Sequence, residues 1–325
     1  MLTSYFNLEH LDDLKVTMGG GAGTHLLNVA LGLVMFGIAL GIKPSNFVDI
    51  IKNPKSIITG IVCQIILLPA LTFLLVVACG NLLSPMVALG MILVAACPGG
   101  NVSNFITALS RGNSELSVSL TAFNTAACIF TTPINFAFWG KMYLDYAGEH
   151  EIVLPQLEIP FWEIFQSIVI IMGIPLVLGM LCAHYYPKIA AKLNKPLQRL
   201  SIVVFVAMVA IIFTSNFSVF LKCITSIFIV VLVHNLLALG IGFGSSTALR
   251  LPYKDRRTLT IETGIQNSGL GLVLLMNPNI FDPAIWEKNG GMVVITAWWG
   301  VWHIISGFTL AYLWRKRGRK EPNEE

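Results

Sequence analysis

The chain has 325 residues, of which 55% are hydrophobic and only 12% are charged, and its mean hydropathy is +0.75. A soluble protein of this length needs far more charged surface, so the composition excludes that class and predicts an all-α polytopic membrane protein. The net charge of +4 reflects how basic residues are divided between loops, and it gives no reason to expect a nucleic-acid partner.

Residues 1–24 hold three acidic side chains and lack the basic leader and apolar run of a signal peptide, so we expect an extracellular or periplasmic N-terminal segment. Apolar stretches of about 18–25 residues then recur. They predict nine transmembrane helices, at 25–42, 56–79, 85–109, 115–139, 161–184, 200–217, 221–244, 258–277 and 292–314. We expect these helices to form one transmembrane domain over 25–314, with halves at 25–139 and 161–314, followed by a cytoplasmic tail at 315–325.

The basic residues predict the orientation. Seventeen of the 21 lysines and arginines fall in one set of loops and in the tail, and the remaining four fall in the other set. Because cytoplasmic loops carry the excess of positive charge, the N-terminus is expected outside and the C-terminus in the cytoplasm. The expected location is the plasma membrane (the inner membrane of a bacterium), with lipid as a partner and no obligate protein partner evident.

The third span is interrupted near its middle. An apolar run from Met86 to Ala96 meets Cys97-Pro98-Gly99-Gly100 before the polar sequence Asn101-Val102-Ser103-Asn104. Proline removes a backbone donor and two glycines loosen the chain, so a break is predicted in preference to a simple kink. Freed backbone groups are tolerated at this depth only when they are buried in protein or line a wet cavity.

The eighth span is interrupted near Gly264, and it carries Glu262, the only acidic residue deep inside a predicted span. An ionisable group at this depth is costly and usually marks a pathway or a partner; a neutral, hydrogen-bonded carboxyl group in a helix bundle is the alternative. The break falls in the third member of each half, counted as spans one to four and six to nine. This position is typical of an inverted-repeat transporter with two broken, crossing helices. We expect spans three, four, eight and nine to form a core domain, and the other spans to form a panel domain.

Three polar features are expected to have structural roles. Ser114 before Glu115 is typical of a helix N-cap. Kinks are expected at three prolines: Pro69, Pro133 and Pro175. His234 and Asn235 are expected to form hydrogen bonds between helices.

Several motifs together resemble the bile acid:sodium symporter family. They are CPGGNVSN at 97–104, RGN at 111–113, LSVSLT at 116–121 and ETGIQNS at 262–268. Their order and spacing match over roughly residues 25–315, and the pairing of the first motif with the last is specific. Asn101 stands where many members have threonine, and Ile304 stands where some bacterial members have a polar residue. Both positions face the substrate cavity in that family.

The resemblance implies two sodium sites. The first consists of Ser103, Asn104, Ser117, Thr121 and Glu262, and the second of Gln64, Glu262, Thr263, Ile265 and Gln266. Their hydroxyl, amide, carbonyl and carboxylate oxygens suit a hard cation. Ser117 and Thr121 also share one face of a helix, although bonds to their own helix carbonyls are the alternative for both.

The substrate is expected at the start of the second half of the third span. There the backbone N–H groups of residues 101–103 would lack helical acceptors, and a helix N-terminus favours an anion. The expected substrate residues are Gly100, Asn101, Val102, Asn267 and His303. His303 is included through the resemblance, and a packing role beside Trp302 is its alternative.

These observations predict a sodium-coupled symporter that imports an organic anion, such as a bile acid or a small carboxylate like pantoate or a keto acid, by alternating access. Two sodium ions and Glu262 sum to a charge of +1, which a monoanion would neutralise. A cation or proton exchanger on the same fold is the alternative. An intramembrane enzyme using Glu262 and His303 is disfavoured, because no nucleophile motif or metal-ligand spacing is present.

Overall fold

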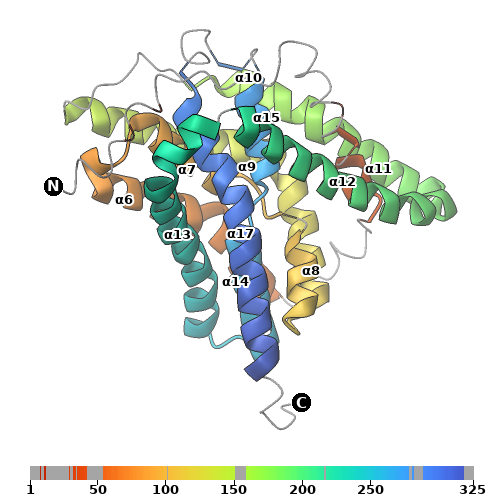
Figure 1. Ribbon diagram of the computed structural model, residues 1–325. Coiled ribbons are helices and arrows are strands. Elements are labelled where there is room, and N and C mark those ends of the chain that lie inside the picture. The colour runs from red at the N-terminus through yellow and green to blue at the C-terminus, as the bar shows by residue number, and fades with distance from the viewer. Residues whose placement is uncertain are drawn as a thin grey trace.

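The computed structural model describes residues 8, 11, 29, 32–33, 35–41, 54–100, 102–150, 159–215, 217–277, 280–281 and 288–317. Within these ranges every regular element is a helix, which confirms the all-helical class (Figure 1). Four helical segments are long and apolar enough to cross a membrane: Pro54–Leu82, Phe161–Tyr185, Ile224–Ala248 and Gly290–Lys316. The count of nine spans stays a prediction, because part of the first span, 25–42, lies outside the described residues.

The first half of the chain contains α5 (Pro54–Val62), the π-helix η1 (Cys63–Leu67), α6 (Leu68–Cys79), the 3-10 turn η2 (Gly80–Leu82), α7 (Pro85–Ala96), α8 (Val102–Leu109) and α9 (Ser114–Glu149). The second half contains α10 (Phe161–Ile168), the π-helix η3 (Val169–Gly173), α11 (Ile174–Tyr185), α12 (Pro187–Ser215), α13 (Phe217–Ala248), α14 (Tyr253–Gly264), α15 (Ser268–Met276) and α17 (Gly290–Arg317). The third and eighth predicted spans are therefore each divided into two helices, α7 with α8 and α14 with α15.

Two of the three prolines expected to cause kinks follow a π-helical turn. Pro69 lies in the first turn of α6, directly after η1, and Pro175 lies in the first turn of α11, directly after η3. Because proline has no N–H to complete the regular ladder, the preceding turn widens instead. Pro133 lies inside α9, and the helix continues through it.

The predicted N-cap of α9 at Ser114 is wrong, because Asn113 holds that position. Asn113 is in an extended conformation, and its side-chain oxygen accepts a hydrogen bond of 3.1 Å from the backbone N–H of Leu116. Both residue types are good caps. Asn113 is also fixed from outside its own helix, because its N–H donates to the hydroxyl of Thr258 at 2.8 Å.

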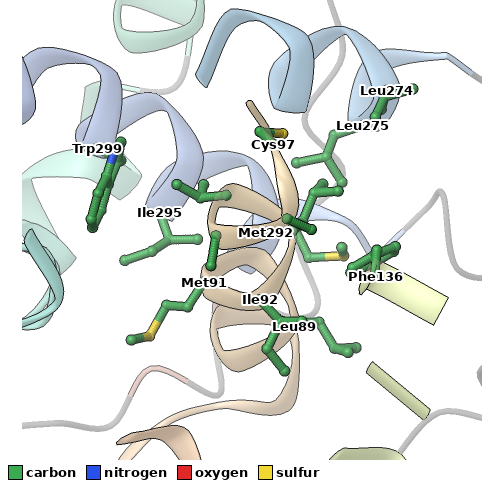
Figure 2. Close-up of a cluster of buried hydrophobic side chains, with 14 of the residues drawn as sticks. Leu89, Met91, Ile92, Cys97, Phe136, Leu274, Leu275, Met292, Ile295 and Trp299 are labelled. Carbon is green, nitrogen blue, oxygen red and sulfur yellow. The ribbon is translucent and has the colours of Figure 1, made fainter. Parts of the chain in front are cut away.

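Helix α7 forms the centre of the hydrophobic core, and every residue from Pro85 to Ala96 is buried. In Figure 2, Ile295 and Trp299 of α17 lie on one side of α7, and Phe136 of α9 lies on the other. Helix α13 packs against both α14 and α17, whereas α11 and α12 pack against each other beside this group (Figure 1). One helix of each broken span, α7 and α15, therefore lies within this core.

Candidate functional site

The break between α7 and α8 leaves carbonyl groups that neighbouring helices satisfy. After Ala96 the chain turns to an extended conformation at Cys97. The Ala96 carbonyl accepts a hydrogen bond of 2.8 Å from the hydroxyl of Thr132 on α9. The Cys97 carbonyl accepts one of 2.9 Å from the side chain of Gln64 in η1. The freed backbone is thus buried in protein and paired, as this depth requires.

The break between α14 and α15 is supported in a similar way. The Gly264 carbonyl, at the end of α14, accepts a hydrogen bond of 2.8 Å from the side chain of Asn235 on α13. Asn235 in turn accepts from the hydroxyl of Ser306 on α17 at 2.6 Å. The expected role of Asn235 as a hydrogen-bonding residue between helices is confirmed. His234 beside it is confirmed in the same role, with its ring 2.8 Å from the hydroxyl of Thr72 on α6.

The two breaks cross and pair through an isolated antiparallel bridge between Gly99 and Gln266. Two backbone hydrogen bonds join the segments, from Gly100 N to Ile265 O at 2.8 Å and from Asn267 N to Pro98 O at 2.8 Å. Each break therefore supplies partners for backbone groups that the other has released from its helix.

Glu262 lies beside this crossing and is 3% exposed. One carboxylate oxygen accepts hydrogen bonds from the hydroxyls of Ser103, at 2.6 Å, and Ser117, and the other accepts from Thr121 at 3.0 Å. The side-chain oxygen of Asn104 accepts from Ser117 at 2.8 Å and from Thr121 at 3.3 Å. All five residues expected for the first sodium site are thus brought together from α8, α9 and α14. The two α9 hydroxyls point toward the carboxylate and Asn104, so the alternative of bonds to their own helix is wrong.

The residues expected for the second sodium site form a connected amide pair. Gln64 and Gln266 donate to each other's side-chain oxygens at 2.8 Å and 3.1 Å. Gln266 also donates to the carbonyl of Thr263 at 2.7 Å. Within the described residues no hydrogen bond joins Glu262 to either glutamine, and the Ile265 carbonyl is taken up by the bridge between the breaks. The structure therefore connects three of these five residues directly.

The expected substrate residues are brought together only in part. Asn101 lies outside the described residues. The expectation that the N–H of Ser103 lacks an acceptor is wrong, because it donates to the Gly100 carbonyl at 2.9 Å. Val102 begins α8. The side-chain oxygen of Asn267 caps α15 by accepting from Leu270 N at 3.1 Å, which leaves its amide nitrogen as the group that can donate.

His303 lies on α17 and is 4% exposed, and its Nδ1 atom has no hydrogen-bond partner among the described residues. Gly307, one turn later on the same helix face, lies against Ile265 of the second break and Ile106 of α8. This places His303 on the side of α17 that faces the broken helices. A contact of His303 with the substrate stays a prediction.

One supporting residue was not identified from the sequence. Thr132 holds the first break, and its position directly before Pro133 in a predicted span was a usable signal, because hydroxyl side chains and proline often mark irregular backbone in membrane helices.

Comparison with known proteins gives concordant matches. The model of the Sodium Bile acid symporter family matches residues 28–223. The uncharacterized sodium-dependent transporter YocS of Bacillus subtilis is 31% identical, over 91% of this chain and 84% of its own length. The ileal sodium/bile acid cotransporter of Cricetulus griseus is 28% identical, over 75% of this chain and 67% of its own. The probable chloroplastic sodium/metabolite cotransporter BASS2 of Oryza sativa subsp. japonica is 28% identical, over 91% of this chain and 65% of its own.

Proposed function

Because this chain belongs to the sodium bile acid symporter family, we propose that it imports an organic anion together with two sodium ions by alternating access. The observation that carries the proposal is the Glu262 carboxylate, buried at the crossing of two broken helices among three hydroxyl donors. A buried carboxylate surrounded by further oxygen atoms suits a small hard cation.

The first sodium ion would bind at the Glu262 cluster. The carboxylate would supply the negative charge, and the oxygens of Ser103, Asn104, Ser117 and Thr121 would complete the shell. In the described structure the hydroxyl hydrogens point toward the carboxylate, and the lone pairs of the same oxygens would face the cation once it enters. A proton alone would need none of these extra oxygens, which favours sodium coupling over proton exchange.

The second sodium ion would bind beside the amide pair. Gln64 and Gln266 already converge on the Thr263 carbonyl region, where Gln266 donates at 2.7 Å. A sodium ion would take the side-chain oxygens of both glutamines with the carbonyls of Thr263 and Ile265, and Glu262 would balance its charge. The reciprocal hydrogen bonds of Gln64 and Gln266 would then have to open.

The anion would lie at the start of α8, near Gly100, Asn101 and Val102, with Asn267 and His303 across from it. The neighbouring relatives are named for bile acid and metabolite transport, and we propose a bile acid or a small carboxylate as the substrate class. With two sodium ions bound, one negative charge on the substrate neutralises the site, and unpaired charge in such a place is costly.

Alternating access would carry the broken helices, with α9 and α17, past the other helices of the bundle. Helix α13 belongs to the seventh span, which was expected in the panel, but its packing on both α14 and α17 supports adding it to the moving part. The pair formed by α11 and α12 would belong to the part that stays still.

The test is uptake by the purified protein in liposomes. Labelled taurocholate, pantoate and a keto acid are each offered with an inward sodium gradient, or with potassium in its place. We expect uptake of one class of these anions to require sodium and to be unaffected by a pH jump. Uptake should also accelerate with an inside-negative potential, since each net charge gains about 2.3 kcal/mol per 100 mV. The recovered label should be chemically unchanged.

Flux that follows the pH gradient and persists without sodium would establish exchange in place of symport. If no anion of the panel adds to a sodium-dependent rise in the melting temperature, the substrate class is wrong. Liposomes without protein serve as the control for leak.

A further inference from the structure

Polar side chains continue from Glu262 toward the opposite end of α14. On each of three helices they recur every three or four residues and so share one helix face. We call this set the polar seam; its members are Ser103 and Thr107 on α8, Asn113, Ser117 and Thr121 on α9, and Asp255, Thr258 and Glu262 on α14. Every member except Asn113, which is half-buried, is buried.

The far end of the seam contains a second buried carboxylate. Asp255 is 7% exposed. One of its oxygens accepts a hydrogen bond of 2.6 Å from the hydroxyl of Ser56 on α5, and the other accepts one of 2.9 Å from the side chain of Asn113. Thr258 lies one turn closer to Glu262 and accepts from the Asn113 N–H at 2.8 Å. Seven residues of helix separate the two carboxylates, about 10 Å along the axis.

Asp255 has no cationic partner among the described residues, although it lies between basic ones. Arg256 directs its Nε to the Leu251 carbonyl at 2.7 Å. Arg257 donates to the Ser110 carbonyl at 2.8 Å, and its guanidinium lies 4.4 Å from the centre of the Tyr253 ring. A buried carboxylate with neutral hydrogen-bond donors alone favours the approach of a cation.

Thr107 lies one turn after Ser103 on α8 and has an unsatisfied oxygen. It is completely buried, and its hydroxyl oxygen has no hydrogen-bond partner among the described residues. A Cβ atom at Gly112 would lie 2.9 Å from the Thr107 methyl group and 2.9 Å from the Thr258 hydroxyl, so both threonines lie against this glycine. Buried hydroxyls normally find a partner, so an unpaired one on a polar seam indicates a group that meets a ligand.

We propose that Asp255 and the hydroxyl oxygens of Thr258 and Thr107 form a third sodium site, which sodium ions occupy in transit between the Glu262 cluster and the end of the bundle where α14 begins. This inference rests on the proposed function. The loops at that end are the basic ones predicted to face the cytoplasm, so the site lies on the release path. A negative charge one step beyond Glu262 lowers the barrier for a cation that leaves the first site.

Asp255→Asn tests the proposal in the full chain, reconstituted in liposomes. We expect sodium-driven uptake to fall about tenfold, because the ion loses a binding site on the release path. Inhibition by internal sodium should need a several-fold higher concentration for the same reason. The sodium concentration that half-stabilises the detergent-solubilised protein against heat should stay close to that of the unmodified chain, because the two sites beside Glu262 hold sodium at rest and the third holds it only in transit.

Ser56→Ala separates a transport role from a structural one. It removes a hydrogen bond that ties the same carboxylate to α5 but keeps the charge. We expect it to lower the melting temperature about as much as Asp255→Asn and to leave the internal-sodium dependence near that of the unmodified chain. If Asp255 only joins α5, α9 and α14, both variants will lose uptake in proportion to stability, and the proposal fails.

Thr107→Val provides a second test, which does not depend on whether the Asp255→Asn variant folds correctly. Its hydroxyl has no structural partner to lose, so the melting temperature should hold or rise, while uptake falls about threefold. Unmodified uptake in both Thr107→Val and Asp255→Asn would overturn the third site. Absence of sodium dependence in the unmodified chain would instead overturn the proposed function.

Discussion

The two helix breaks reach a similar geometry by different means. Between α7 and α8 the interruption is built into the covalent chain, because Pro98 cannot donate to a helix and two glycines follow it. Between α14 and α15 no proline is present. There the helix ends at Gly264, whose carbonyl is taken by the side chain of Asn235 on another helix.

The difference shows which break depends on the other. The Ile265 carbonyl and the Asn267 N–H are both paired with the first break, through Gly100 and Pro98. The first break also ends its helix without help from a neighbour, because Pro98 and two glycines interrupt the chain there. Glu262, the one charged side chain beside the crossing among the described residues, thus lies on the break that depends more on its neighbours. A substitution at either break should therefore disturb the Glu262 cluster. A substitution in the Glu262 cluster should disturb the breaks less.

Removing the charge should have the largest effect. In Glu262→Gln we expect sodium-driven uptake to fall at least about 100-fold, because two sodium ions and one anion would leave a net positive charge in a buried site. Initial rates of uptake in liposomes measure this. The amide can still accept from Ser103, so the melting temperature without sodium should be close to that of the unmodified chain, while its rise on adding sodium should be lost. Accumulation that persists in this variant would show that the charge is not needed.

Pressing the two breaks apart should have the next largest effect. In Gly100→Ala the new Cβ atom would lie 2.9 Å from the Gln266 carbonyl oxygen, whereas in Gly99→Ala the nearest atom would be the Glu262 carbonyl oxygen at 3.4 Å. We expect Gly100→Ala to cost about 2–3 kcal/mol of unfolding free energy and the neighbouring variant less than about 1 kcal/mol. Thermal unfolding in detergent compares this matched pair. Equal losses of unfolding free energy in the two variants would mean that the close approach of Gly100 to Gln266 is not important for stability.

The positions of the two breaks could be predicted from the sequence, for physical reasons. Pro98 with Gly99 and Gly100 has a strong local signature, because proline and glycine act on the backbone wherever they occur. The second break gave a weaker signal, from Gly264 and the polar residues after it. The grouping around Glu262 was predicted through a family resemblance, since spacing along the chain alone does not bring α8, α9 and α14 together.

The parts that were not predicted depend on contacts between distant helices. Thr132 and Asp255 look unremarkable in the sequence, one beside a proline and the other among basic residues. Their roles follow from partners 36 and 199 residues away in the chain. The cap at Asn113 was missed in favour of Ser114 for a related reason, because Thr258 on α14 holds Asn113 from outside the helix it caps.

Removing the side chains that support each break should have the smallest effect and gives the most direct test of the comparison. Asn235→Leu leaves the Gly264 carbonyl without its donor, and Thr132→Val does the same to the Ala96 carbonyl. We expect losses of about 1–2 kcal/mol for the first and about 1 kcal/mol or less for the second, because Pro98 and its glycines keep the first break in shape without Thr132. Denaturant unfolding in detergent measures both. Asn235→Leu should also weaken stabilisation by sodium, since Gly264 is two residues from Glu262, and Thr132→Val should not. If Thr132→Val loses more unfolding free energy than Asn235→Leu, the second break keeps its shape without Asn235. The position of the Glu262 carboxylate then does not depend on neighbouring helices.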